Sequence, residues 1–150
     1  MPDIRISRRT DRPPTEVWSL VTDWERHGAS VPLTRTTVTP PGPSRVGTVF
    51  TARTGVGRLS FADPMEIVRW DPPREGAPGV VRLVKRGRIV RGWARIEVRP
   101  GWVLWREEIS LPGLGWADPL ISFAGRRLFA RALDRVLGAA QAPGGRSVAR

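Results

Sequence analysis

The chain has 150 residues, of which 40% are apolar and 26% charged, and this composition fits one compact domain. Because cysteine is absent, disulfides, thiol nucleophiles, cysteine-based zinc sites and iron–sulfur clusters are excluded. With His27 as the single histidine, a metal site built on several histidines of one chain is excluded as well.

The net charge of +11 comes from 25 basic and 14 acidic residues, and Lys85 is the only lysine among them. This balance suggests nucleic acid, anionic lipid or an acidic small molecule as partner, although charge also keeps ordinary domains soluble. Met1 to Arg5 lacks the basic-then-apolar pattern of a signal peptide, and no window is apolar enough to cross a membrane. We therefore expect a cytoplasmic protein without a transmembrane segment.

The N-terminal region predicts a strand and then a helix. Asp3 to Arg8 alternates apolar and polar residues, as a half-buried strand does. After a pair of prolines, apolar residues recur at helical spacing from Val17 to Trp24, which predicts a helix that ends near this tryptophan. Glu25 to Gly28 is interpreted as a turn or a second small helix, and threonine-rich 33–39 as extended chain.

The middle of the chain predicts successive strands joined by tight turns. Thr54 to Gly57 supplies a hairpin turn, and Asp63-Pro64 is expected to interrupt a strand, because proline implies a bulge or a sheet edge. The predicted strands are 46–53, an interrupted strand made of 58–62 and 65–70, and then 80–85, 89–99 and 102–111. Since every connection is hairpin-like, the sheet should be antiparallel.

The C-terminal region predicts one long amphipathic helix, from about Asp118 to Ala140. Its predicted inward face consists of Ile121, Gly125, Leu128, Phe129, Ala132, Val136 and Ala139. A segment rich in proline and glycine follows, so we expect one domain over residues 1–141 and a disordered tail over 142–150.

Several segments in this element order are similar to the START-like helix-grip superfamily, and within it to the polyketide cyclase/dehydrase family. They are 17–24, Val46-Gly47-Thr48, Asp63-Pro64-Met65-Glu66, Trp70-Asp71-Pro72-Pro73, Gly92-Trp93-Ala94, Trp105-Arg106-Glu107-Glu108 and the terminal helix. The resemblance covers about residues 3 to 140. It implies an α+β helix-grip fold, in which a curved antiparallel sheet of about seven strands wraps around the long C-terminal helix, with one or two short helices after the first strand. It also implies an elongated apolar cavity between sheet and helix, since family members bind or transform lipids, sterols and polyketides.

The strand at 102–111 carries the most informative residue, Glu107. Glu107 shares one face with Trp105 and other apolar residues, while Arg106 and Glu108 share the other face. A carboxylate on the inward face is costly unless it is paired, so Glu107 should have a partner or a raised pKa. It either orients a ligand hydroxyl or moves a proton in a pocket, or it forms an ion pair with an arginine. A register shift of one residue would place Glu108 inside instead.

Further residues of the predicted ligand site come from other elements. Lys85 shares a face with apolar residues of its strand and meets Glu107 if it points inward, although a lysine at a strand end more often points outward. Trp24 and Trp105 either offer flat surfaces to a ligand ring or pack in the core.

Small residues on the long helix have two interpretations. Gly125 and Ala132, beside Leu128 and Phe129, either let the helix approach the sheet or leave a void above it. The fold resemblance favours the void. The predicted ligand-binding residues are therefore Trp24, Lys85, Trp105, Glu107, Leu128, Phe129 and Ala132.

His27 is expected at the surface or at a helix end, with the cavity mouth as the alternative. No Gly-x-Ser-x-Gly segment exists in the chain, so a catalytic triad is not expected. Gly55-Val56-Gly57 lacks the third glycine and the following helix of a dinucleotide fingerprint, and no Walker sequence exists, so we expect no cofactor.

The outer face of the predicted sheet is basic. Arg91, Trp93 and Arg95 should point outward together, where they suit phosphates and a stacked base or an acidic bilayer. Glu97 and Glu108 on the same face dilute the positive field, which favours an ordinary solvated surface.

These patterns predict a protein that binds a hydrophobic or amphipathic small molecule between sheet and C-terminal helix. One alternative is a polyketide cyclase or dehydratase that uses Glu107 to move a proton. Related aromatase/cyclases combine Tyr, His and Arg in their pockets, and the absence of tyrosine weakens this alternative. The other alternative is binding of nucleic acid or of an anionic membrane through the basic outer face; nucleic acid is the less expected partner and peripheral membrane contact remains open.

Overall fold

The computed structural model describes residues 3–138. The predicted tail at 142–150, the end of the predicted domain at 141 and the predicted helix end at Ala140 lie outside the described residues. The elements are β1 (Asp3–Arg9), α1 (Pro14–Val21), α2 (Trp24–Ala29), β2 (Thr34–Thr39), β3 (Val49–Val56), β4 (Leu59–Asp71), β5 (Gly79–Arg86), β6 (Arg91–Arg99), β7 (Trp102–Ser110), the 3-10 turn η1 (Gly115–Ala117) and α3 (Asp118–Gly138).

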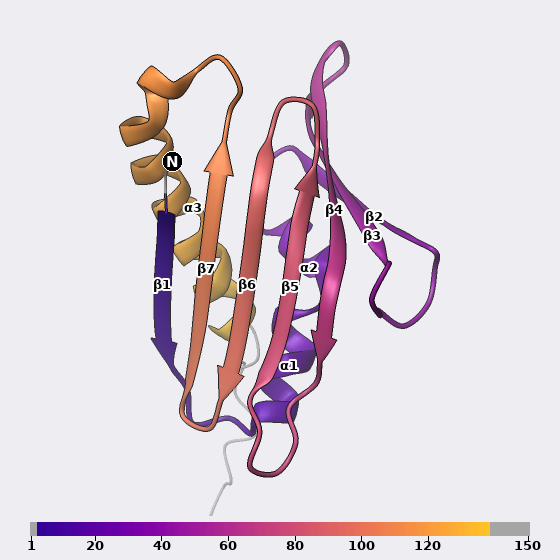
Figure 1. Ribbon diagram of the computed structural model, residues 1–150, viewed down its shortest axis with the longest axis vertical. Coiled ribbons are helices and arrows are strands. Elements are labelled where there is room, and N and C mark those ends of the chain that lie inside the picture. The colour runs from indigo at the N-terminus through magenta and orange to yellow at the C-terminus, as the bar shows by residue number, and fades with distance from the viewer. Residues whose placement is uncertain (1–2, 139–150) are drawn as a thin grey trace, which may run out of the picture.

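Seven antiparallel strands form one sheet in the order β1-β7-β6-β5-β4-β3-β2. The helices lie behind this sheet in Figure 1, with α3 on the side of β1 and β7 and with α1 and α2 behind β4 and β5. This arrangement confirms the predicted α+β fold, in which a curved sheet and a long C-terminal helix form the two layers. The face that carries the helices is called the concave face below, and the opposite face is called the outer face.

The first helix ends earlier than the sequence pattern predicts. It stops at Val21, and the Asp23 side chain accepts a hydrogen bond from the Arg26 backbone N–H at 3.1 Å. Such a capping carboxylate starts a new helix. Trp24 is therefore the first residue of α2, not the last residue of α1.

The predicted break at Asp63-Pro64 does not occur, because β4 runs without interruption from Leu59 to Asp71. Pro64 pairs with Thr51 of β3, whereas pairing with β5 begins only at Met65. At the proline, β4 thus has a neighbour on one side only, and a missing backbone N–H is tolerated there. The register irregularity lies further on, between Ile67 and Arg69.

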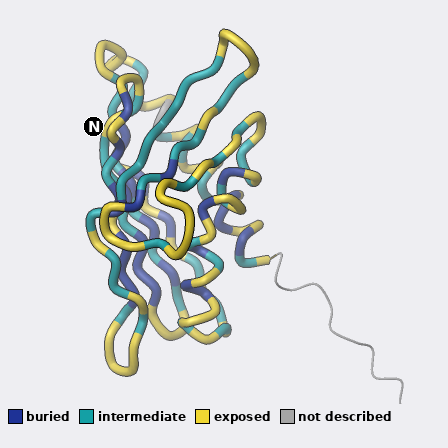
Figure 2. Tube along the Cα trace, turned by 90° about the vertical axis from the view of Figure 1, so that its right-hand side faces the viewer, coloured by how far each residue is buried: buried dark blue, intermediate teal, exposed yellow. Residues whose placement is uncertain are grey.

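The core lies between the concave face and the helices. Figure 2 shows the buried segments in the strands and at the inner side of the helices. From the sheet come Ile4, Ile67, Leu83, Ile96 and Val103, and from the helices come Val17, Val21, Leu133 and Val136, all of which are buried. Such a continuous apolar layer between helix and sheet is the main source of stability for this architecture.

Candidate functional site

Strand register brings three charged side chains to the concave face. Glu107 on β7 pairs with Ala94 on β6, and Lys85 on β5 pairs with Met65 on β4. Asp63 on β4 lies two residues before Met65 and therefore points to the same face. The register question is thereby settled, since Glu107 is 1% exposed and points inward.

The three charges form one contiguous cluster, called the Asp63–Lys85–Glu107 cluster below. The Lys85 Nζ lies 2.7 Å from the Asp63 Oδ2 and 3.2 Å from the Glu107 Oε1. The Trp105 indole N–H donates to the Glu107 Oε2 at 3.1 Å. Lys85 thus points inward and meets Glu107, although a lysine at a strand end was expected more often to point outward, and it takes the place of the arginine expected as the partner of Glu107.

Burial and attraction act against each other in this cluster. Burial raises the pKa of Glu107 above its ordinary value, and the attraction of Lys85 offsets only part of this effect. Burial lowers the pKa of Lys85, but Glu107 and Asp63 outweigh it, so the pKa of the ammonium is raised. Lys85 is therefore a stable cation at neutral pH, and Glu107 is a carboxyl group that takes up a proton more readily than usual.

Asp63 provides an acceptor that the described residues leave unused. Its Oδ2 binds Lys85, whereas its Oδ1 is buried and has no hydrogen-bond partner among the described residues. A buried acceptor without a donor costs about 1–3 kcal/mol. A ligand hydroxyl or ammonium that donates to this oxygen would remove that cost.

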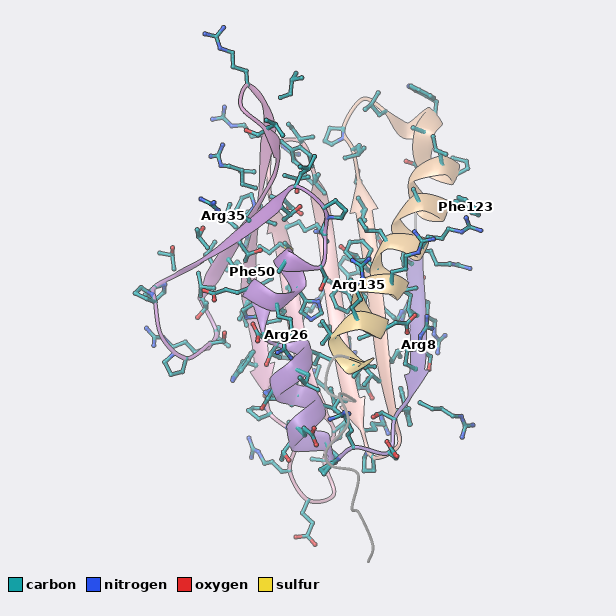
Figure 3. The ribbon with its side chains drawn as sticks, turned by 180° about the vertical axis from the view of Figure 1, so that it is seen from behind. Arg8, Arg26, Arg35, Phe50, Phe123 and Arg135 are labelled. Carbon is teal, nitrogen blue, oxygen red and sulfur yellow. The ribbon has the colours of Figure 1, made fainter. Side chains whose placement is uncertain are left out.

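Aromatic side chains pack beside the cluster. The Trp24 ring stacks on Phe50 with centroids 4.4 Å apart, and the Trp105 ring stacks on Phe129 at 5.7 Å. Trp24 also donates its indole N–H to the Ser44 hydroxyl at 3.0 Å. Trp24 and Trp105 thus have protein partners for their rings, as the core-packing alternative predicts, and Phe50 is labelled on the inner side of β3 in Figure 3.

His27 is partly buried, with its ring turned toward Trp105. Its Nε2 lies 2.8 Å from the Val21 carbonyl oxygen, so this nitrogen carries the proton and donates. Its ring is 5.4 Å from that of Trp105. Burial lowers the pKa of His27 to about 4, although the bond to Val21 and the charge of Asp23 act in the opposite direction. The helix-end prediction is therefore correct, because His27 lies in the last turn of α2, but the ring faces the sheet and is not fully exposed.

The predicted inward face of α3 is only partly correct. Ala132 is 4% exposed and Phe129 packs against the core, but Leu128 is 36% exposed. Leu128 lies seven residues before Arg135, so both are on the same side of the helix. The Arg135 guanidinium donates to the Ser30 carbonyl just after α2 at 2.9 Å. Figure 3 labels Arg135 on the side of α3 toward α2. Leu128 therefore lies on the side of α3 that faces α2 and is open to solvent there.

At Gly125 the close-approach alternative is correct. A Cβ atom built on Gly125 would lie 2.8 Å from the Ile4 Cδ1, so the glycine lets α3 approach β1. The helix therefore rests directly on the sheet at this position, and the void that the fold resemblance favoured does not lie there.

Two surface pockets lie away from the cluster. One of about 650 Å³ lies at the ends of β1 and α3, lined by Arg8, Arg9, Arg12, Asp134 and neighbouring residues. The other, of about 250 Å³, lies beside Trp24 and is lined also by Asp23, Val38 and Ser44. The first pocket carries no residue of the predicted ligand site, and the second carries only Trp24.

The outer face has the predicted composition, and much of its charge is paired. Glu97 accepts from Arg95 at 3.0 Å and from Arg99 at 2.5 Å. The guanidinium of Arg82 lies over the Trp93 ring at 5.6 Å, and that of Arg106 at 5.9 Å. The arginines and the indole that the sequence suggests as a polyanion-binding surface are therefore in contact with other groups of the protein.

Sequence reasoning missed two important residues of the concave face. Asp63 was read only as part of a strand break, although Phe61, Asp63 and Met65 alternate as the residues of one strand face do. Leu133, which is fully buried, lies one position beyond the predicted apolar face of α3. The alternation around Asp63 was visible in the sequence. The burial of Leu133 depends on the rotation of α3, which its packing against the sheet decides.

No protein-family model matches the sequence, and no curated protein matches it. Among solved structures, the Zhui aromatase/cyclase from Streptomyces sp. R1128 is similar with a TM-score of 0.66 and 15% identity, over 93% of each chain. The di-domain aromatase/cyclase BexL has a TM-score of 0.68 and 14% identity, over 95% of this chain and 50% of that one. Norcoclaurine synthase from Thalictrum flavum, in complex with dopamine and hydroxybenzaldehyde, has a TM-score of 0.60 and 14% identity, over 95% and 88%.

No helix in the described part of the chain is long and apolar enough to cross a membrane. The likeness to these solved structures confirms the fold resemblance that the sequence predicts. The chain has a helix-grip fold like that of the aromatase/cyclases and of norcoclaurine synthase.

Proposed function

We propose that the protein binds a small molecule with an apolar body and a hydrogen-bond donor on its concave face. The observation that carries this proposal is the Asp63–Lys85–Glu107 cluster, in which one buried Asp63 oxygen has no donor within the described residues. Ligand sites combine an apolar lining with a few polar groups that fix orientation, and the cluster supplies such groups.

The surroundings of the cluster are apolar and incompletely covered. Met65 and Val90 pack against the core but are only partly buried, and Leu128 is partly exposed on the side of α3 that faces α2. An apolar ligand that covers these side chains gains about 25 cal/mol for each Å² removed from water. The proposed ligand therefore has an apolar part against these residues and a donor directed at Asp63.

The comparisons support the ligand class without naming the ligand. Two of the similar structures are aromatase/cyclases, and the third holds dopamine and hydroxybenzaldehyde, which are small aromatic molecules with hydroxyl groups. A hydroxylated aromatic or polyketide-like molecule is accordingly the proposed guest.

A pair of probes tests this proposal. 2-Naphthol has an apolar body and a hydroxyl donor, whereas naphthalene lacks the donor. We expect 2-naphthol to bind at least about tenfold more tightly, because a hydrogen bond to a charged group contributes about 1.5–3 kcal/mol. Isothermal titration calorimetry measures both affinities.

The matched variants are Asp63→Ala and Asp71→Ala. Asp71 is also on β4, but its side chain is 44% exposed and pairs with Arg69. Asp63→Ala should abolish the preference for 2-naphthol, and Asp71→Ala should retain it, with a thermal melt confirming that both variants are folded. Equal binding of the two probes by the unaltered protein would exclude Asp63 as the anchoring group.

A second candidate function is proton transfer in a cyclase or dehydratase reaction. The raised pKa of Glu107 favours it, because a carboxyl group with such a pKa exchanges protons near neutral pH more effectively. Lys85, at 3.2 Å from Glu107, would stabilise negative charge on a substrate carbonyl oxygen. With a poly-β-ketone substrate, Glu107→Gln should leave affinity nearly unchanged and remove turnover; surviving turnover would contradict this role.

Polyanion binding by the outer face stays a prediction. If it occurs, affinity for single-stranded nucleic acid should fall steeply as salt rises, and Arg95→Glu should remove it. Because Arg95 is paired with Glu97, we expect this interaction to be weak.

A further inference from the structure

Large exposed apolar side chains gather at one end of the molecule. Ten such side chains are exposed among the described residues, and eight of them lie at the same end. These eight residues, called the apolar end below, are Leu33, Val56, Leu59, Ile89, Leu114, Trp116, Leu120 and Phe123. Single exposed apolar residues need no explanation, but such a concentration marks an interaction surface.

Three separate chain segments place these residues together. The β3–β4 turn, the β5–β6 turn and the connection from β7 through η1 into α3 all lie at the upper end in Figure 1. Leu33 joins the first of them, because the Gly55 N–H donates to its carbonyl oxygen at 3.0 Å. Leu59 is 90% exposed and Trp116 is 80% exposed, so the tips of these segments present their side chains to the surroundings.

Arginines accompany the apolar residues. The segments 55–60, 86–91 and 111–127 contain six arginines and one acidic residue, Asp118, and one of these arginines, Arg86, is paired with Glu66 at 3.0 Å. Arg58 lies in the turn between Val56 and Leu59, and both Arg58 and Arg88 are exposed. The Arg127 guanidinium lies 4.6 Å from the centre of the Phe123 ring, on the outer side of α3 in Figure 3. The apolar end therefore has a strong positive charge as well as apolar tips.

We propose that the apolar end docks onto the surface of an anionic lipid bilayer. Apolar side chains that enter the boundary between headgroups and acyl chains, with arginines at headgroup level, are the features of interfacial membrane binding. A tryptophan at the contact fits the same environment. Each basic residue near an anionic surface adds about 1 kcal/mol of attraction.

The shape of the apolar end favours a bilayer over a protein partner. Its residues come from several separate loop tips and one helix start. A protein partner needs one complementary surface, whereas a fluid bilayer accepts several tips at one depth. This proposal is independent of the proposed ligand, because none of its residues belongs to the Asp63–Lys85–Glu107 cluster.

Vesicle flotation tests the proposal with the full chain. Vesicles of phosphatidylcholine with phosphatidylserine should bind the protein at least about tenfold more tightly than vesicles of phosphatidylcholine alone. Binding should weaken as salt rises, because salt screens the arginines. Equal binding to both kinds of vesicle, or no binding to either, would overturn the proposal.

Substitutions at exposed positions test vesicle binding without disturbing the core. The double variant Leu59→Ser with Trp116→Ser should bind the anionic vesicles about tenfold or more weakly, because two large apolar side chains are lost. The control is Val46→Ser, which is 59% exposed but lies in the β2–β3 connection. An equal loss with Val46→Ser would overturn the proposal, and so would dimerisation that the double variant abolishes while vesicle binding stays unchanged.

Discussion

The concave and outer faces of the sheet each carry a group of three charged side chains, and the ratio of positive to negative charges is opposite in the two groups. On the concave face one cation, Lys85, lies between two carboxylates. On the outer face one carboxylate, Glu97, lies between Arg95 and Arg99. The Lys85 and Glu107 side chains are 4% and 1% exposed, whereas those of Arg95 and Arg99 are 43% and 48% exposed.

The difference between the two groups is their access to water. On the outer face Glu97 is only 7% exposed, but water reaches both arginines that pair with it, so removing one arginine leaves the carboxylate with a second partner. On the concave face the charges have lost their water, so each depends on its partners. The Asp63 Oδ1 has no hydrogen-bond donor among the described residues to replace that water. The same kinds of residue therefore leave their cations open to water on one face and enclose the cation in a candidate binding site on the other.

The largest expected effect comes from removing the cation of the concave group. Lys85→Met leaves two carboxylates without their shared partner, so we expect the free energy of unfolding to fall by about 3–5 kcal/mol. Urea unfolding at neutral pH measures it. Adding Glu107→Gln to this variant should restore part of the loss, and a loss below about 1 kcal/mol for Lys85→Met would show that the cluster is as solvated as the outer group.

The second expected effect is a pH dependence of the free energy of unfolding, caused by His27 on the concave side of the sheet. The pKa of His27 is lowered from its ordinary value of 6.5 to about 4, so between these values the unfolded chain binds the proton more readily than the folded one. The contribution of neutral His27 to the free energy of unfolding is complete above pH 6.5 and is lost as pH falls toward 4. The total loss is roughly 3 kcal/mol.

The variant His27→Gln cannot titrate and isolates this contribution. Its free energy of unfolding should change by roughly 3 kcal/mol less than that of the unaltered protein between pH 6.5 and 4. Urea unfolding at several pH values gives both curves. Parallel curves would mean that the histidine is solvated and would contradict its place against Trp105.

The smallest effect is expected on the outer face, where Arg95→Gln is the counterpart of Lys85→Met. Because the Arg95 side chain is 43% exposed and Glu97 keeps Arg99, the free energy of unfolding should change by at most about 1 kcal/mol. Added salt should reduce the change further. A loss as large as that of Lys85→Met would remove the distinction between the two faces.

Strand alternation predicted the parts of the site that depend on one strand at a time. Glu107 and Lys85 each lie among apolar residues at a period of two, so their inward direction follows from the pleat. Their meeting depends on the order of the strands, and the fold resemblance supplied the architecture in which that order is possible.

The remaining parts depend on contacts between elements and could not be predicted in this way. Asp63 was missed because the following proline suggested a break, and only the one-sided pairing of β4 at Pro64 explains why the strand continues. The exposure of Leu128 follows from the rotation of α3, in which Gly125 lies against Ile4 and Leu133 and Val136 are buried.

The most direct test of the proposed site is a crystal structure of the protein with 2-naphthol. We expect the naphthol oxygen within hydrogen-bond distance of the Asp63 Oδ1, with the ring against Met65 on the concave face. Naphthol bound instead in the pocket of about 650 Å³ beside Arg8, with the concave face unchanged, would contradict the account.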